Sequence, residues 1–164
     1  MATIRHPIHL LDRAVMLPMR KMVAPMKGSV TGPEARKPFD ELMEQTPAAA
    51  GVTYELASVG GVAGVWCRPE GAPDSAAAIL HFHGGAYIVG SALAYQHFVG
   101  QIVARTKIAA FVPEYGLAPE RPFPAAVDEA QAVYVGLVTQ GFTRIALAGD
   151  SAGGGLASVA STCF

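Results

Sequence analysis

The chain has 164 residues, of which 12 are Lys or Arg and 13 are Asp or Glu, giving a formal net charge of −1. This length suits one ordinary domain rather than two, and the near balance of charge offers no attraction for nucleic acid or an anionic membrane, so neither is expected as a partner. Charged residues make up only 15% of the chain, against roughly 25% in an ordinary soluble domain, which indicates either a large core or an uncovered apolar surface.

The N-terminus carries no clear targeting signal. Its apolar stretches are interrupted by charged residues and by Pro7, unlike the core of a secretory signal. The sequence has no apolar run near the roughly 18 residues of a transmembrane helix. Cys67 and Cys163 are far apart and form neither a disulfide framework nor a metal-ligand spacing. We therefore expect a cytoplasmic protein without a metal or an organic cofactor.

Residues 1–50 differ from the remainder by their many methionines. Apolar residues at spacings of three and four predict a helix within 8–26, and 39–43 predicts a second, short helix. A methionine-rich apolar face is ordinarily packing. The alternative is an adaptable lid over an apolar substrate site, because thioether side chains repack easily. We therefore divide the chain into an N-terminal helical lid segment at 1–50 and a core at 51–164.

The core has regularly spaced turn signals that separate short strands from longer helices. Strands are expected at 52–59, 62–67, 76–83, 109–115 and 144–148, and helices at 95–103, from about 124 to 138 and from 152 onward. Two strands followed by repeated strand–helix units predict an α/β fold with a mostly parallel central sheet and helices on both faces.

The stretch Gly149-Asp150-Ser151-Ala152-Gly153 lies between the last expected strand and the last expected helix. A sharp strand–turn–helix connection exposes a serine hydroxyl, and it requires small residues two positions to either side. The helix N-terminus adds N–H donors where negative charge would develop. Ser151 is therefore a candidate nucleophile, and the alternative is a purely structural glycine turn. A phosphate loop is disfavoured, because Gly155 stands where such a loop needs lysine.

A second glycine-rich segment, His83-Gly84-Gly85-Ala86-Tyr87, directly follows the expected buried strand at 76–83. Acyl transfer passes through an oxyanion that backbone N–H groups stabilise. Gly84 and Gly85 are candidate donors, with Ala152 beside the nucleophile as a third. His83 could act as a general base, but its place before the glycines favours a supporting role in which it orients the loop.

Four blocks together resemble the hormone-sensitive lipase-like branch of the α/β-hydrolases, the bacterial family IV esterases. They are HFHGGAY at 81–87, EYGLAPE at 114–120, PFPAAVDE at 122–129 and GDSAGGG at 149–155. The resemblance covers about residue 50 to the end, and residues 1–50 look like the lid helices of that family.

This resemblance implies a serine esterase or lipase that hydrolyses small carboxylic esters through an acyl-Ser151 intermediate, with Asp150 holding the elbow. The DYRLAPE block usual in the family departs here at Glu114 and Gly116. An acidic residue–arginine pair is lost, so we expect the packing of that loop to differ.

In this fold the acid and the base of the catalytic triad follow the nucleophile in sequence. Only nine residues follow Gly155, and no histidine follows His97. We therefore expect a front half of an esterase, truncated after the elbow, without the acid and base. The strand at 144–148 would then be an open edge, which predicts self-association along it. The alternative functions are an inactive fragment and a non-catalytic ligand-binding protein of this fold.

Overall fold

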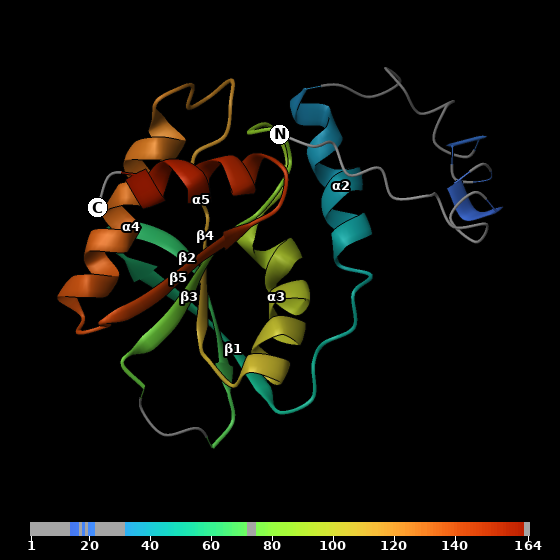
Figure 1. The fold of residues 1–164 in the computed structure, drawn as a ribbon. Coiled ribbons are helices and arrows are strands. Elements are labelled where there is room, and N and C mark those ends of the chain that lie inside the picture. Colours follow the sequence, from blue (N-terminus) through green and yellow to red (C-terminus); the bar gives the residue numbers. More distant parts are fainter. Residues whose placement is uncertain (1–13, 17, 19, 22–31, 72–74, 163–164) are drawn as a thin grey trace, which may run out of the picture.

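The computed structural model describes residues 14–16, 18, 20–21, 32–71 and 75–162 (Figure 1). The helix expected within 8–26 lies mostly outside these residues, although those described at 14–16, 18 and 20–21 are helical. The division at residue 50 remains an expectation.

Five strands form one mixed sheet in the order β1-β2-β4-β3-β5 (Figure 1). They are β1 (Val52–Val59), β2 (Val62–Pro69), β3 (Ala77–Phe82), β4 (Ala110–Pro113) and β5 (Arg144–Gly149). β2 is antiparallel to β1 and β4, whereas β3 is parallel to β4 and β5. The expected strands and the α/β fold with a central sheet are confirmed. The sheet is mixed: β4, β3 and β5 are mutually parallel, whereas β2 forms a hairpin with β1 through the tight turn at Gly60 and Gly61 and is also antiparallel to β4.

Three helices cover the two faces of the sheet: α3 (Ala92–Thr106), α4 (Ala125–Thr139) and α5 (Ala152–Thr162). One core cluster joins Leu80 of β3 to Leu137 of α4 and Leu156 of α5. The neighbouring Ile79 belongs to a second cluster, which contains the buried side of α3. Successive strand residues therefore face opposite layers, and all six residues of β3 are buried. This is the three-layered α/β arrangement that the sequence predicts.

A further helix, α2 (Arg36–Met43), follows the short 3₁₀ turn η2 (Pro33–Ala35) and packs on the outer side of α3 (Figure 1). Phe39 of α2 stacks on Tyr95 of α3 with ring centroids 6.4 Å apart. The helix expected at 39–43 is confirmed and begins three residues earlier. Its packing brings its first residue, Arg36, to the loops that follow β3 and β4.

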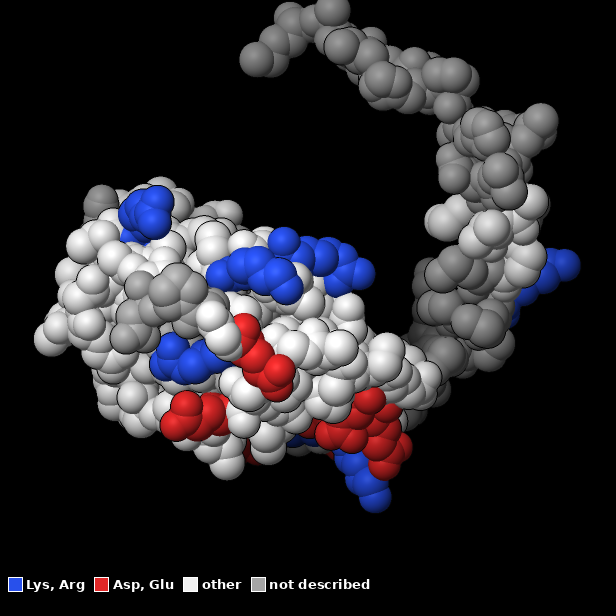
Figure 2. All heavy atoms as spheres, turned by 90° about the horizontal axis from the view of Figure 1, so that it is seen from below, with Lys and Arg blue, Asp and Glu red and all other residues white. Residues whose placement is uncertain are grey.

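In the part of the chain that the structure describes, β5 pairs with β3 on one side and with no strand on the other. Its residues are half-buried or exposed, and Ala146 is among the exposed ones. Charged side chains leave wide uncharged areas on the face shown in Figure 2, where both signs are present. Among the described helices, none has the length and the apolar character that crossing a bilayer requires.

Candidate active site

Ser151 is exposed in the turn between β5 and α5, with a backbone φ of +51°. The glycines on either side allow this turn. A Cβ at Gly149 would lie 2.8 Å from the carbonyl oxygen of Phe82, and one at Gly153 would lie 2.6 Å from that of His83. Ordinary contacts need at least about 3.4 Å. The two backbones therefore meet without a side chain between them, which is the geometry of a nucleophile elbow.

The first turn of α5 leaves one amide beside Ser151 without an acceptor. Gly153 donates to the carbonyl of Asp150 at 2.8 Å, and Gly155 donates to that of Ser151 at 3.3 Å. The Ala152 N–H has no acceptor among the described residues. An N–H at a helix N-terminus that lacks an intrahelical partner is suited to bind an anionic group.

The side chain of Asp150 connects the elbow to the glycine loop after β3. Its Oδ1 accepts the backbone N–H of Gly84 at 3.0 Å, and its Oδ2 accepts the Tyr95 hydroxyl at 3.1 Å. Because a backbone amide has a single hydrogen, Gly84 is not free to serve as an oxyanion donor, and that expectation is corrected. Glycine suits this position because a Cβ there would overlap the Asp150 carboxylate that holds the loop.

Ala86 and Tyr87, which follow Gly85 in this loop, have backbone conformations that side chains disfavour. Ala86 has a φ of +54° and Tyr87 a φ of +62°, a region that residues other than glycine rarely adopt. The Tyr87 hydroxyl donates to the carbonyl of Ala152 at 2.9 Å, which ties the loop to the elbow. The amides of Gly85 and Ala86 have no acceptor within the described residues.

His83 is fully buried and supports the loop from below. Its Nδ1–H donates to the Gly84 carbonyl at 2.8 Å, and its ring stacks on Tyr115 with centroids 4.2 Å apart. Burial lowers the pKa of His83 to about 4, so the ring is neutral at pH 7. Burial also lowers the pKa of His81. Neither histidine has a hydrogen bond to Ser151.

The two departures from the DYRLAPE block have local partners. Glu114 accepts the N–H of Ala92 at 2.6 Å, at the start of α3. Gly116 leaves room for Arg121, whose Cβ would lie 2.9 Å from a Cβ at position 116. Arg121 forms an ion pair with Glu129, and Glu129 also accepts the N–H of Gly116 at 2.5 Å. The packing of this loop thus rests on an arginine five residues further along the chain.

An apolar cavity of about 380 Å³ lies beside Tyr87, between the loop that follows β4 and helices α4 and α5. Phe123 and Val159 are among its lining residues and are exposed. The described residues contain no group of three His, Cys, Asp or Glu side chains that could hold a metal ion. Sequence reasoning missed both Tyr87 and Tyr95, because an aromatic residue in a loop or on a helix gives no local signal of its partner.

Comparison with known proteins gives concordant matches. A family profile described as "alpha/beta hydrolase fold" matches residues 79–163. An acetyl-hydrolase of Streptomyces hygroscopicus is 39% identical over 108 residues, which cover 65% of this chain and 36% of that protein. The hormone-sensitive lipase of Homo sapiens is 37% identical over 98 residues, 56% of this chain and 9% of the lipase.

A crystal structure of a hormone-sensitive lipase from a metagenome library superposes with a TM-score of 0.81 at 37% identity. The match covers 93% of this chain and 52% of that one. The chain therefore spans about half the length of the solved lipase and about a third of the acetyl-hydrolase.

The glycine contact at the elbow can be tested with a matched pair of alanine variants. Gly153→Ala should lower the free energy of unfolding by about 2–3 kcal/mol, because the new methyl group meets the Phe82 and His83 carbonyls. Gly154→Ala should be close to neutral, since its Cβ would lie 3.3 Å from the nearest backbone oxygen and alanine favours the helix by about 1 kcal/mol. Urea unfolding of both variants measures the difference, and equal stabilities would contradict the contact.

The buried His83 should make stability depend on pH. The pKa of His83 is 6.5 in the unfolded chain and about 4 in the folded chain. Between pH 6.5 and pH 4, the His83 ring is therefore protonated in the unfolded chain and neutral in the folded chain. Stability should therefore fall as the pH drops through this window, by at most about 3 kcal/mol from this group. The variant His83→Asn keeps a donor for the Gly84 carbonyl and should lose less stability over the same range. Coincident pH profiles of the two proteins in urea unfolding would refute this assignment.

Proposed function

Since the chain belongs to the α/β-hydrolase family, in its hormone-sensitive lipase-like branch, we propose that Ser151 is the nucleophile of a carboxylic-ester hydrolase. The observation that carries the proposal is the elbow itself. The serine is exposed at a strained turn, and its neighbouring glycines touch the backbone at the end of β3.

In the proposed reaction the Ser151 Oγ adds to the ester carbonyl and gives up its proton to a base. The carbonyl oxygen becomes an oxyanion, which then collapses and expels the alcohol, leaving an acyl group on Ser151. We assign the oxyanion donors to Ala152, Gly85 and Ala86, because their amides have no acceptor among the described residues. Ala86 replaces Gly84 in this set. One such donor is worth roughly a hundredfold to a thousandfold in rate.

We further propose that the acid and base of the triad come from outside this chain. His81 and His83 are buried, and His97 lies on α3, where its Nδ1 is 3.2 Å from the Thr46 carbonyl. None of the three forms a hydrogen bond with Ser151. Serine hydrolases that lack triad members keep roughly a thousandfold to ten-thousandfold acceleration over water. This residual chemistry is what we assign to the chain alone.

The proposed substrates are esters of short or medium acyl chains, in keeping with the relatives named acetyl-hydrolase and esterase. A cytoplasmic location is proposed as well. It is supported by Cys67, a free cysteine, because proteins of oxidising compartments ordinarily use their cysteines in disulfides.

Incubation with p-nitrophenyl butyrate should attach one butyryl group to Ser151 slowly and with little turnover, because both acylation and deacylation normally use a base that we place outside this chain. Intact-mass spectrometry measures the adduct, and release of p-nitrophenol measures turnover. Ser151→Ala should abolish the adduct, whereas Ser158→Ala, an exposed serine two turns along α5, should not. Rapid turnover that depends on Ser151 would show that this chain supplies its own base, and an adduct that persists in Ser151→Ala would exclude Ser151 as the nucleophile.

We also propose that the chain self-associates along β5. Within the described residues, the side of β5 away from β3 pairs with no strand, and unpaired N–H and C=O groups readily pair with another strand. Helix α5, which packs against β5, adds the exposed apolar side chain of Val159.

At micromolar concentration the protein should therefore scatter light as a species larger than a monomer. Ala146→Lys places a charge on the exposed face of β5 and should shift the population toward monomer. Thr139→Lys, at the exposed end of α4, is the control and should not. A wild-type protein that is monomeric at these concentrations would refute self-association.

A further inference from the structure

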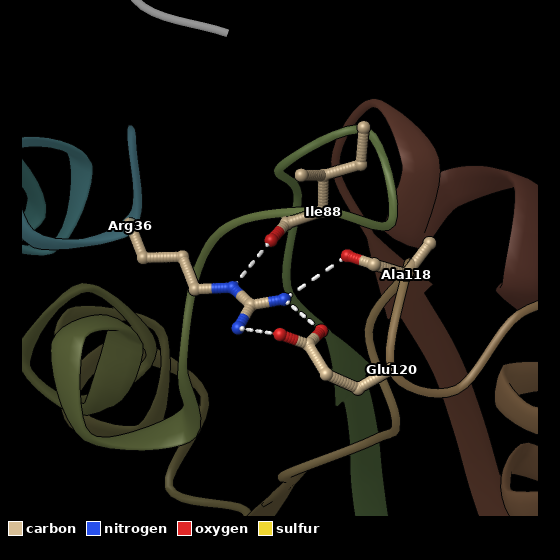
Figure 3. Close-up of polar contacts among 4 residues, drawn as sticks. All are labelled: Arg36, Ile88, Ala118 and Glu120. Carbon is tan, nitrogen blue, oxygen red and sulfur yellow. Dashed lines mark hydrogen bonds and ion pairs between the residues drawn. The ribbon is translucent and has the colours of Figure 1, made fainter. Parts of the chain in front are cut away.

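Arg36, the first residue of α2, makes four hydrogen bonds through its guanidinium group (Figure 3). Its Nε donates to the Ile88 carbonyl at 2.8 Å, and one terminal nitrogen donates to the Ala118 carbonyl at 3.0 Å. The two terminal nitrogens also hold the Glu120 carboxylate, at 3.0 and 2.5 Å. The three partners belong to two loops, one after β3 and one after β4.

The hydrogen bonds of Arg36 hold one end of the loop that carries the proposed oxyanion donors. Ala118, whose carbonyl accepts from Arg36, donates its own N–H to the Tyr87 carbonyl at 2.8 Å. The Ile88 N–H in turn donates to the Gly85 carbonyl at 2.9 Å. The carbonyls of Tyr87 and Ile88 are therefore fixed from outside the loop, and that of Gly85 from within it.

Helix α2, which carries Arg36, is held against α3 by two further contacts. One turn after Arg36, Asp40 accepts the Ser91 hydroxyl at 3.1 Å, at the N-terminus of α3. Phe39 stacks on Tyr95, the residue that also holds Asp150 beside the nucleophile. Helix α2 therefore positions Arg36 relative to the same framework that carries Ser151.

We propose that Arg36 is a positioning residue for the oxyanion loop, and that docking of α2 thereby sets the geometry of the active site. The proposal rests on the proposed function of that loop. Residues with a positive φ, such as Ala86 and Tyr87, persist only where surrounding contacts hold them. Arg36 supplies a contact of this kind from a segment about fifty residues away in the sequence.

The pattern of acceptors requires arginine rather than any cation. A planar guanidinium can bind a carboxylate with two nitrogens and still reach two carbonyls, whereas the ammonium of lysine is a point charge. The ion pair with Glu120 is partly exposed, with side chains 32% and 57% accessible, and pairs of this kind contribute little to overall stability. We therefore expect the loss of Arg36 to disturb the loop while leaving the fold intact.

Hydrogen–deuterium exchange of the whole chain tests this inference directly. In Arg36→Ala, the amides of Ile88, Val89 and Ala118 should exchange about tenfold faster, while the core amides of β3 and the thermal midpoint stay unchanged. Arg36→Lys keeps the charge and should restore only part of the protection. Lys37→Ala is the matched control, since the Lys37 side chain is 86% accessible and its ion pair among the described residues is with Glu41 on the same helix. Loop exchange in Arg36→Ala equal to that in Lys37→Ala would overturn the proposal.

The rate of Ser151 butyrylation provides the second readout. It should fall about tenfold in Arg36→Ala, because a displaced oxyanion donor costs rate even when the fold persists, and it should be unchanged in Lys37→Ala. An unaltered rate with faster loop exchange would also overturn the positioning role. If the wild-type chain forms no adduct at Ser151, the proposed function fails, and the exchange data still decide whether Arg36 holds the loop.

Discussion

At the carboxyl ends of β3 and β5, two segments of backbone touch without an intervening side chain. The Cα of Gly153 faces the carbonyls of Phe82 and His83, and Gly149 faces Gly153 across the turn. This contact fixes how far Ser151 stands from the loop that begins at His83. Because the loop starts where the contact ends, Ser151 and the amides proposed as oxyanion donors are positioned by a single close approach.

Polar groups then hold the two sides of this contact in register. Asp150 precedes Ser151 and bonds to both Gly84 and Tyr95, so the elbow, the loop and α3 share one carboxylate. The neutral ring of His83 is buried under the glycine loop, and its Nδ1–H donates to the Gly84 carbonyl. Buried polar groups of this kind stabilise a structure only when their partners are in place. The Asp150 carboxylate and the His83 Nδ1–H have their partners within the chain, whereas the amides of Gly85, Ala86 and Ala152 have no acceptor among the described residues.

The sequence was informative wherever the determinant is local. The apolar run at 76–83 and the glycines around Ser151 predict β3 and the elbow, since strand burial and a tight turn each restrict the residues at the positions they occupy. The assignment of Gly84 failed for the opposite reason: the acceptor of its N–H is a side chain 66 residues away. The position of β4 between β2 and β3 and the docking of Arg36 are likewise set by tertiary contacts, which leave no periodic trace in the sequence.

The loop after β4 shows how such contacts limit the routes open to evolution. Arg121 occupies the space that a side chain at position 116 would need, and it satisfies Glu129 from there. A side chain at position 116 is therefore compatible with Arg121 only if that arginine moves from its present place. The two positions are epistatic: a residue larger than glycine at 116 displaces the arginine that pairs with Glu129, so the effect of a substitution at either position depends on the residue at the other.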